Sequence, residues 1–481
     1  MAWHWIGILA HLLLQFAFII RVLLRPHRLP SSRIAWIAII GALPVIGMLA
    51  YVALGEVDPN RKIIDRIRRA MHDLPIPGAS GQGLLDVAAH YHLPTEMVPL
   101  FRIAQSINGY PAVPGNRGEL YPDSEVAMVA LAAAIDAARE TVHVAFYIWL
   151  PDGNGSLIAE ALVRAASRGV VCRVMVDDIG GRHIVKSPHW SAMQHAGVRL
   201  VRALPVGSVL KNLAHGRFDM RNHRKIVVID NRIGFCGSQN CADAAFRIKA
   251  KYAPWVDVWL RLEGPVVAQN QHLFATDWMG QVDEDLSPLF ADPAPAIEGG
   301  FVASAVGTSA AVRYAAMPEL FATLIAAAQG ELMITTPYYV PDEILQGSLC
   351  ATARRGVAVT MIMPARNDSW IVAGAARSFY RELLDAGVRI FEYPLGLLHA
   401  KTMTIDGHIT LIGSANMDRR SFDLNFENNV LLYDAAFTAT IRARQQSYLG
   451  ASSEVTTEQV DAWPAWRVLA NNALATVGPV L

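Results

Sequence analysis

The chain has 481 residues, too long for one ordinary domain, so two or three domains are predicted. Its 42 basic and 42 acidic side chains balance, so net charge gives no support for a nucleic-acid partner, and any attraction for anions must be local. The four cysteines form no C-x-x-C pair and no cluster with histidines, which argues against a disulfide framework or a zinc site and favours small core residues in a reduced compartment.

The N-terminal part contains two uncharged apolar runs, 1–20 and 34–55, separated by a loop with four arginines. Each run is about 20 residues long, enough for a helix to cross the hydrocarbon layer of a bilayer. A cleaved signal peptide would carry its charge before the apolar run, and a buried soluble hairpin rarely uses runs this long. We therefore expect residues 1–60 to form a hairpin of two transmembrane helices in a multi-pass protein. The distribution of the flanking arginines and lysines slightly favours a cytoplasmic location for the rest of the chain.

Residues 61–120 are expected to be a juxtamembrane linker. A helix with a basic face is predicted over 61–72, a Pro/Gly/Ser-rich break over 75–83 and a short helix over 96–107.

From residue 121 to 290, helical and strand-like segments alternate. Helices are predicted over 124–139, 157–167 and 189–195, and strands over 142–150, 170–176, 197–201 and 256–262. The order returns in residues 301–481, with helices over 320–328 and 343–353 and strands over 332–340 and 357–363. This succession predicts an α/β fold of two similar lobes, each a mixed sheet flanked by helices. We expect a pseudo-twofold axis between them and one site at their interface.

The same motif occurs once in each lobe. It reads H-x-K-x-x-x-x-D followed by G-S-x-N, beginning at His223 and again at His399. In both copies the glycine lies fourteen residues after the histidine (237 − 223 = 14; 413 − 399 = 14). Two copies with identical internal spacing indicate a duplicated catalytic unit. A basic stretch with Lys211, His215 and Arg217 leads into the first copy only and is expected to attract an anion.

The residue types of the motif fit a phosphodiester substrate. The candidate catalytic residues are His223, Lys225, Asp230, His399, Lys401 and Asp406. Residues two apart in a strand share a face, so each lysine points the same way as its histidine. Each aspartate lies at an odd offset from its histidine and is interpreted as structural. The candidate phosphate-binding residues are the lysines with Asn240, Asn416, Ser238 and Ser414.

One histidine can attack phosphorus and form a covalent intermediate, while the other protonates the leaving alkoxide and then deprotonates the incoming alcohol or water. A carboxylate on the second ring nitrogen would fix the tautomer of each histidine. Asp257 and Glu427 are the candidates for this role, with ordinary salt bridges as the alternative.

The two motifs resemble those of the phospholipase D superfamily. Further segments resemble bacterial cardiolipin synthases, namely LAYVALG at 49–55, RNHRK at 221–225, TPYYVPD at 336–342 and NMDRRSFDLNFE at 416–427. The resemblance implies a phosphatidyltransferase of the bacterial inner membrane. A phosphatidyl group would move from one phosphatidylglycerol to the enzyme as glycerol leaves, and then to a second phosphatidylglycerol to give cardiolipin. It also implies that His223 is the nucleophile and His399 the acid and base, and that no metal or other cofactor is needed.

Other functions remain open at this stage. A lipid phosphodiesterase or another phosphatidyltransferase would use the same site chemistry. A nuclease fits the basic stretch, but the apolar N-terminus counts against it, and no nucleic-acid partner is expected. A lipid-binding protein without activity is disfavoured because both motifs are intact. The reverse assignment of the two histidines, the oligomeric state and the role of the apolar segment 463–481, an interface helix or plain packing, are also open.

Overall fold

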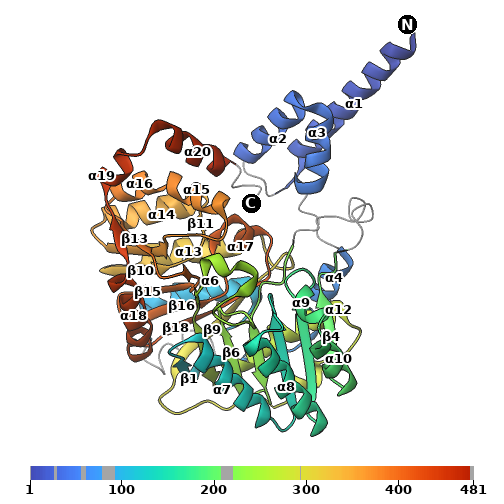
Figure 1. Ribbon diagram of the computed structural model, residues 1–481, viewed down its shortest axis with the longest axis vertical. Helices are drawn as coiled ribbons and strands as arrows, with labels where there is room; N and C mark the ends of the chain where they lie inside the picture. Colours follow the sequence, from blue (N-terminus) through green and yellow to red (C-terminus); the bar gives the residue numbers. More distant parts are fainter. Residues whose placement is uncertain are drawn as a thin grey trace. The chain divides into compact units, whose positions relative to one another are not determined.

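The computed structural model of the chain describes residues 2–26, 30–55, 61–78, 93–206, 220–292 and 294–476 (Figure 1). The basic stretch at Lys211, His215 and Arg217 lies outside the described residues. The chain forms two compact units. The smaller one is built mainly from Met1–Lys62, and the larger one from Ile63–Pro205 and Arg221–Gly478.

The smaller unit is a set of apolar helices. They are α1 (Ala2–Leu24), α2 (Pro30–Ala42), α3 (Pro44–Ala50) and one π-helical turn, η1 (Tyr51–Gly55). The ring of Tyr51 contacts Phe18 and Trp36 edge to face and joins α1 to α2. Most other side chains of α1 are apolar and exposed. Among the described residues, one helix, Trp3–Leu24, is long and apolar enough to cross a membrane.

The second apolar run differs from its prediction. Instead of one helix over 34–55, it forms the three shorter elements α2, α3 and η1. The break lies at Leu43, whose backbone leaves the helical region (φ −130°, ψ 70°) directly before Pro44. Proline lacks the N–H that would continue the helix, and its ring disfavours helical dihedrals in the preceding residue. The second run is therefore helical in three pieces, and the transmembrane hairpin over residues 1–60 stays a prediction.

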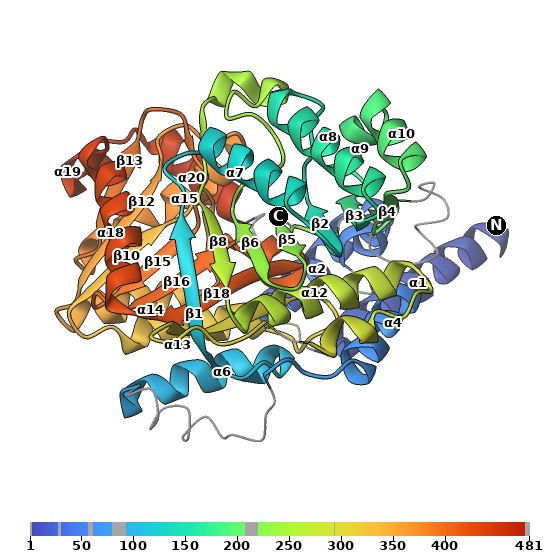
Figure 2. The ribbon, with the colours of Figure 1, turned by 90° about the horizontal axis from the view of Figure 1, so that it is seen from below.

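A 15-stranded mixed sheet runs through the larger unit (Figures 1 and 2). Its order is β19-β13-β12-β10-β15-β16-β18-β9-β1-β8-β6-β5-β2-β3-β4. The first half of the chain contributes β1 (Val113–Leu120), β2 (Thr141–Phe146), β3 (Val171–Asp177), β4 (Arg199–Ala203), β5 (Ile226–Ile229), β6 (Ile233–Gly237) and β8 (Trp259–Glu263). The second half contributes β9 (Phe301–Thr308), β10 (Glu331–Thr335), β12 (Ala358–Pro364), β13 (Arg389–Tyr393), β15 (Thr402–Ile405), β16 (Ile409–Gly413), β18 (Glu427–Tyr433) and β19 (Ser453–Val455).

Apart from β19 at one edge, the strand order is symmetric about the pair β1 and β9. On one side β2, β3 and β4 are parallel, and on the other β10, β12 and β13 are parallel. The motif strands β5 and β15 each run antiparallel beside these sets. The prediction of two similar lobes, each with a mixed sheet, is thus confirmed. The two lobes share one sheet, and β1, which lies in the segment expected to be a linker, is at its centre.

Two short strand pairs lie outside the main sheet. They are β7 (Trp255–Val256) with β14 (Leu397–Leu398), and β11 (Tyr339–Val340) with β17 (Met417–Asp418). The first pair joins the two lobes directly.

Helices cover both faces of the sheet. The helices and turns up to the end of the first lobe are α4 (Arg61–Asp73), η2 (Thr95–Met97), α6 (Val98–Asn108), α7 (Ser124–Asp136), α8 (Gly153–Ser167), α9 (Arg182–Val185), α10 (Pro188–His195), η3 (Arg247–Tyr252), α12 (Val266–Gln281) and η4 (Ser287–Phe290). The later ones are α13 (Ala316–Ala327), α14 (Glu343–Arg354), α15 (Trp370–Ser378), α16 (Tyr380–Asp385), α17 (Arg419–Asp423), α18 (Ala435–Gly450), α19 (Thr457–Asp461) and α20 (Ala465–Thr476).

Three hydrophobic cores hold these layers together. One lies under α7 and α8 in the first lobe, and one under α6, α13 and α14 in the second. The third contains residues of both lobes and is covered by α12 and α18. All four cysteines are free and buried, as the sequence predicts for small core residues. Because the third core is shared, the two motif strands are held in fixed positions relative to each other.

Candidate active site

The two motifs are anchored across the boundary between the lobes. His223 and Lys225 directly precede β5, and His399 and Lys401 directly precede β15; all four side chains are buried. The backbone N–H of His223 donates to the Phe426 carbonyl of the second lobe (2.9 Å). That of His399 donates to a carbonyl of the first lobe, at Val256 (2.8 Å). Each histidine is therefore positioned by the other lobe.

The carboxylates cross in the same way. His223 Nδ1 lies 2.8 Å from Glu427 Oε2, and His399 Nδ1 lies 2.6 Å from Asp257 Oδ1. The two acids come from equivalent places, Asp257 just before β8 and Glu427 at the start of β18. With Nδ1–H donating to a carboxylate, the lone pair of each ring is on Nε2. The structure thus brings all four predicted side chains together, as two dyads that each span the lobes.

Ser238 and Ser414 lie behind the carboxylates. The hydroxyl of Ser238 donates to Asp257 Oδ1 (2.6 Å), and that of Ser414 donates to Glu427 Oε2. A serine hydroxyl has one hydrogen, and an ionised phosphate oxygen needs a donor. The structure therefore gives both serines a part in holding the acids, and their contact with a phosphate stays a prediction.

Both lysines fold back onto their own motif. Lys225 Nζ donates to the His223 carbonyl (2.6 Å), and Lys401 Nζ donates to the His399 carbonyl (2.5 Å). The ammonium of Lys225 also lies 5.4 Å from the ring centroid of Tyr147. These contacts hold each cation beside its histidine, as the two-residue spacing predicts.

Asp230 and Asp406 have the structural role interpreted from their odd offset. Asp230 accepts three backbone N–H bonds of 2.8–2.9 Å from residues 139–141. Asp406 accepts three of 2.8 Å from residues 329–331. Both residues have positive φ, 50° and 48°. Each aspartate therefore ties the end of its motif strand to the start of the neighbouring strand, β2 or β10.

The motif asparagines are buried but are fixed differently. Asn240 Oδ1 accepts from the Ile148 backbone N–H (3.2 Å), which leaves its amide N–H groups as donors. In the second copy, Asn416 Nδ2 lies 3.3 Å from the Ser421 hydroxyl. The repeat is therefore not strictly symmetric at these positions.

Several residues around the histidines were not identified from the sequence. The ring of His223 contacts Tyr147 (centroids 4.9 Å apart), and that of His399 contacts Trp255 (4.7 Å) and Tyr338 (6.3 Å). Tyr338 in turn donates to Asp368 (2.6 Å). The available signal was that Tyr147 directly follows β2 and Tyr338 lies three residues after the end of β10.

A buried ion pair supports the first motif. Arg224, between the motif histidine and lysine, lies 2.7 Å from Asp277 Oδ1. Its Nε donates to the Glu427 carbonyl (3.1 Å). Asn222 donates to the other oxygen of Asp277 (2.9 Å). These bonds fix the backbone of β18 beside the motif and hence the position of the Glu427 carboxylate.

Burial sets the protonation of the site. It lowers the pKa of His223 to about 4, and it also lowers the pKa of His399. Burial likewise lowers the pKa of Lys225 to about 8 and that of Lys401 to about 7. Burial alone would raise the pKa of Glu427, but the adjacent His223 and Lys225 bring it below its ordinary value. Near neutral pH the rings are therefore neutral and the carboxylates ionised.

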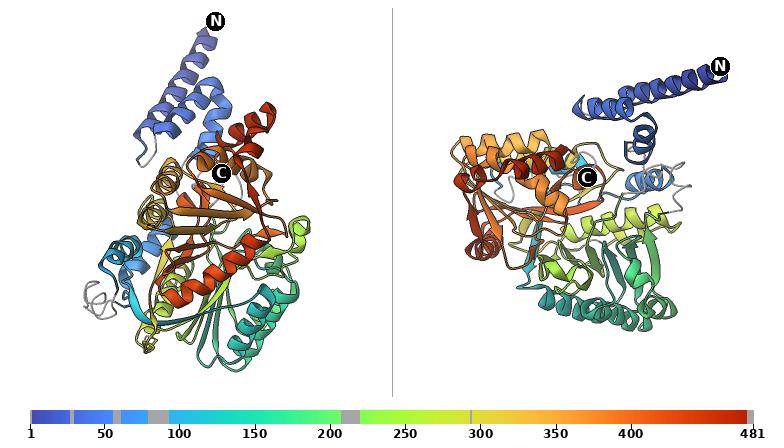
Figure 3. Two further views of the ribbon diagram at one scale, coloured as in Figure 1. Left: turned by 90° about the vertical axis from the view of Figure 1, so that its left-hand side faces the viewer. Right: turned by 45° about the horizontal axis from the view of Figure 1, so that its top comes forward.

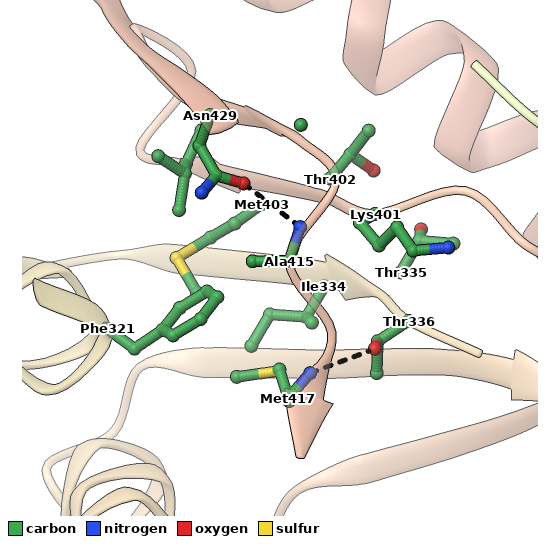
Figure 4. Close-up of a pocket in the computed structure, with 12 residues that line it drawn as sticks. Phe321, Ile334, Thr335, Thr336, Lys401, Thr402, Met403, Ala415, Met417 and Asn429 are labelled. Atoms are coloured by element: carbon green, nitrogen blue, oxygen red, sulfur yellow. Dashed lines mark hydrogen bonds between the residues drawn. The ribbon is translucent and has the colours of Figure 1, made fainter. Parts of the chain in front are cut away.

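A small cavity lies beside Lys401, between β10, β15 and β16 (Figure 4). Thr335, Thr336 and Met403 are among its lining residues, and its volume is about 10 Å³. This is room for about one water molecule. The cavity is thus too small to hold a lipid headgroup and lies behind the catalytic side chains. Among the described residues, no group of three or more His, Cys, Asp and Glu side chains could hold a metal ion.

The chain is similar to known proteins over both motifs. A family model described as cardiolipin synthase, PLD-like domain, matches residues 131–278 and 321–448, and a phospholipase D-nuclease N-terminal model matches 13–56. Cardiolipin synthase A of Shigella boydii serotype 4 (strain Sb227) is 33% identical over 490 residues, covering 99% of this chain and 98% of the relative. The protein of the same name from Escherichia coli (strain K12 / DH10B) has the same identity and coverage.

Among solved structures, a phosphatidylserine synthase of Haemophilus influenzae Rd KW20 is similar in fold, with a TM-score of 0.59 at 15% identity. The match covers 80% of this chain and 100% of the synthase chain. The matches to the sequence extend over nearly the whole chain, and both crossed dyads lie within the matched lobes. The chain therefore belongs to the cardiolipin synthase family of the phospholipase D superfamily.

Proposed function

We propose that this enzyme transfers a phosphatidyl group from one phosphatidylglycerol to the headgroup hydroxyl of another, yielding cardiolipin and glycerol. The observation that carries the proposal is the pair of crossed dyads, His223 with Glu427 and His399 with Asp257, each beside a lysine. Two neutral imidazoles and two cations at one site match a phosphodiester that is attacked on one side and loses an alkoxide on the other. The relatives named cardiolipin synthase A support the same substrate class.

In the first half-reaction, Nε2 of His223 attacks phosphorus, and the bond from phosphorus to the glycerol headgroup oxygen breaks. His399 gives its Nε2 proton to that oxygen, and glycerol leaves. The lowered pKa of His223, about 4, is compatible with a nucleophile, because the attacking ring must be neutral. The negative charge of the bound phosphodiester favours a proton on His399. Lys225 and Lys401 neutralise the charge that develops on the non-bridging oxygens.

In the second half-reaction, the now neutral His399 accepts the proton of the headgroup hydroxyl of the second phosphatidylglycerol. The oxygen attacks phosphorus, the bond from phosphorus to His223 breaks, and cardiolipin is released. Both histidines then have their starting protonation. Asp257 and Glu427 keep each ring in the Nδ1–H tautomer throughout.

We further propose that α1 anchors the protein in the bacterial cell membrane with the catalytic body on the cytoplasmic side. The apolar surface of α1 and the N-terminal family match at 13–56 support membrane attachment. The side can be tested by protease access to the body. Digestion in inside-out vesicles but not in spheroplasts is expected, and the reverse pattern would refute the assignment.

The activity is tested by incubating purified protein with phosphatidylglycerol in vesicles with a chelator present. We expect cardiolipin and glycerol in equal amounts, and no product from a His223→Ala variant. Phosphatidic acid without cardiolipin would instead identify a phosphodiesterase. Loss of activity on chelation would contradict the metal-free mechanism.

The roles of the histidines are tested by trapping. A His399→Ala variant lacks both the acid of the first step and the base of the second, so it is loaded with a phosphatidyl lipid whose p-nitrophenolate leaving group departs without a proton. A phosphatidyl group should then accumulate on His223, detectable by peptide mass spectrometry. The matched His223→Ala variant should accumulate none. A phosphatidyl group on His399 in that variant would reverse the assignment.

A further inference from the structure

The C-terminal helix α20 exposes large apolar side chains, while its inward side mixes polar and apolar residues. Trp466, Leu469 and Ala473 recur at helical spacing on the outside, with Trp466 and Leu469 each 71% exposed. The inner side carries the buried Asn471 and the partly buried Arg467, which stacks on a tryptophan ring at 4.2 Å. A surface helix of a soluble protein turns its apolar side to the core and its polar side to water. The outer side of α20 therefore fits an apolar medium better than water.

Helix α15 extends this surface. It packs against α20, the helix near the dark red end of the colour bar in Figure 3. The contact is so close that a Cβ on Gly374 would lie 2.3 Å from the Leu474 side chain. Trp370, the first residue of α15, is 71% exposed. Two large indole rings thus lie exposed on one pair of packed helices. Large exposed apolar side chains gathered on one helix pair are typical of an interaction surface.

The turn η3 adds positive charge next to Trp370. Its sequence, RIKAKY, has three cations and no acid, and Ile248 among them is 45% exposed. Lys249 forms an ion pair with Asp368, two residues before Trp370. The same segment continues to Trp255, whose ring packs on His399. The apolar and basic surface is therefore continuous with the residues that surround a catalytic histidine.

We propose that α20, the start of α15 and η3 form a bilayer-docking surface that lies in the headgroup region of an anionic phospholipid membrane. The proposal rests on the proposed function, in which both substrates are bilayer lipids. Tryptophan rings favour the membrane interface, the leucine and isoleucine side chains reach below it, and the cations attract anionic headgroups. Docking would place the site where lipids can enter without leaving the bilayer.

Immersion can be measured with a spin label on Leu469→Cys in the full chain, since the four native cysteines are buried. Val129→Cys, on α7 and 61% exposed, is the matched control. In vesicles of phosphatidylethanolamine and phosphatidylglycerol, the label at 469 should collide more with oxygen and less with a nickel chelate, while the label at 129 stays aqueous. Equal, aqueous behaviour at both positions would overturn the proposal. Shielding of 469 from both reagents would also overturn it and would identify a protein surface, such as a second copy, as the occupant.

Activity supplies an independent readout. A Trp466→Ser/Leu469→Ser variant should lose about tenfold or more of its activity on vesicles, because apolar contacts with the bilayer are removed, and should keep its activity in detergent micelles. Equal losses in both would show that the residues serve the fold and would overturn the proposal. Failure of the proposed function gives a different pattern, in which the label on Leu469→Cys is immersed but wild-type protein makes no cardiolipin.

Discussion

Glu427 and Asp257 each accept from a histidine that belongs to the other lobe, and each is also held by a serine hydroxyl. Glu427 has one further donor, the Asn425 amide (3.1 Å). A buried carboxylate with this many donors stays ionised and fixed. It can therefore hold the tautomer of its histidine and stabilise the ring when a proton is bound.

Replacing Glu427 by Gln should lower kcat by a factor of about 10² to 10⁴, because the ring of His223 loses its charged partner. Steady-state cardiolipin formation measures the effect. Asp230→Asn is the matched control, since Asp230 belongs to the same motif but bonds only to backbone N–H groups. It should lower the melting temperature and leave kcat of the folded protein nearly unchanged. A large fall of kcat in the control would contradict the structural role of Asp230.

The pH profile of kcat/KM should have two limbs. Activity rises as His223 loses its proton near its pKa of about 4, because only the neutral ring attacks phosphorus. It falls as His399 loses the proton that it gives to glycerol, with a pKa that burial lowers. It falls further as Lys401 and Lys225 lose their protons, with pKa values of about 7 and about 8, because neutral amines no longer bind the phosphate. Lys401→Arg stays charged and should move the alkaline limb to higher pH. An unchanged alkaline limb would contradict this assignment. Lys249→Arg is the control and should leave the pH profile unchanged.

The chemistry of these residues could be predicted from the sequence, but their pairing could not. The duplicated spacing identified both histidines and lysines, and the odd offset identified the aspartates as structural. Asp257 and Glu427 are chemically similar, so residue type does not say which histidine each one meets. The partners of the two serines could not be predicted for the same reason, because a hydroxyl can donate equally well to a phosphate or to a carboxylate.

At the scale of elements, the glycine of each G-S-x-N segment sets the spacing between strands. A Cβ on Gly413, at the end of β16, would lie 2.4 Å from the Asn428 carbonyl oxygen of β18. A Cβ on Gly237, at the end of β6, would lie 2.4 Å from the Val258 carbonyl oxygen. These neighbouring segments carry Glu427 and Asp257. The glycines therefore let the acids come close enough to reach their histidines.

Gly413→Ala should lower the free energy of unfolding by about 1–3 kcal/mol, because β16 and β18 must move apart. It should also reduce kcat, since Glu427 moves with β18. Gly347→Ala is the matched control. Gly347 lies inside α14 with open space around it, so alanine there should stabilise by up to about 1 kcal/mol. Thermal melting in detergent measures the stability of both variants, and cardiolipin formation measures their activity. A Gly413→Ala variant with unchanged stability and activity would refute the argument.

The elements themselves were partly predictable. The α/β order and the cap at Asp123, which accepts from the Val126 N–H (2.9 Å), follow from local signals. The break in the second apolar run could not be predicted from composition, because the run stays apolar on both sides of Pro44. The backbone nevertheless leaves the helical region directly before this proline. The strand β1 was missed because its sequence, VPGNRGEL, contains a proline and two glycines, residues that are rare in central strands.

At the scale of the whole molecule, the continuous sheet and the shared third core make the two lobes one folding unit. Each lobe supplies a histidine and a lysine to one half of the chemistry and a carboxylate to the other half. A single lobe therefore contains a histidine without its acid, and we expect it to be inactive.

Mixing two inactive full-length variants tests whether the site is built within one chain. His223→Ala and His399→Ala, reconstituted together in the same vesicles, should show no activity, because each molecule keeps one damaged dyad. The matched control is wild-type protein mixed with either variant, which should keep the activity of the wild-type fraction. Recovered activity in the first mixture would mean that lobes exchange between copies.

The crossing of the carboxylates also indicates how such a chain can arise. In a symmetric dimer, if one residue of the first subunit contacts another residue of the second, the reverse contact must also occur. The two dyads have this form, so the chain has the geometry of a homodimer whose subunits were joined. Once joined, the halves could vary separately, and they differ in the acid, Asp257 or Glu427, and in Trp255, a ring that His399 contacts in addition to Tyr338. Fusion thus allows one imidazole to specialise as nucleophile and the other as acid and base, which identical subunits cannot do.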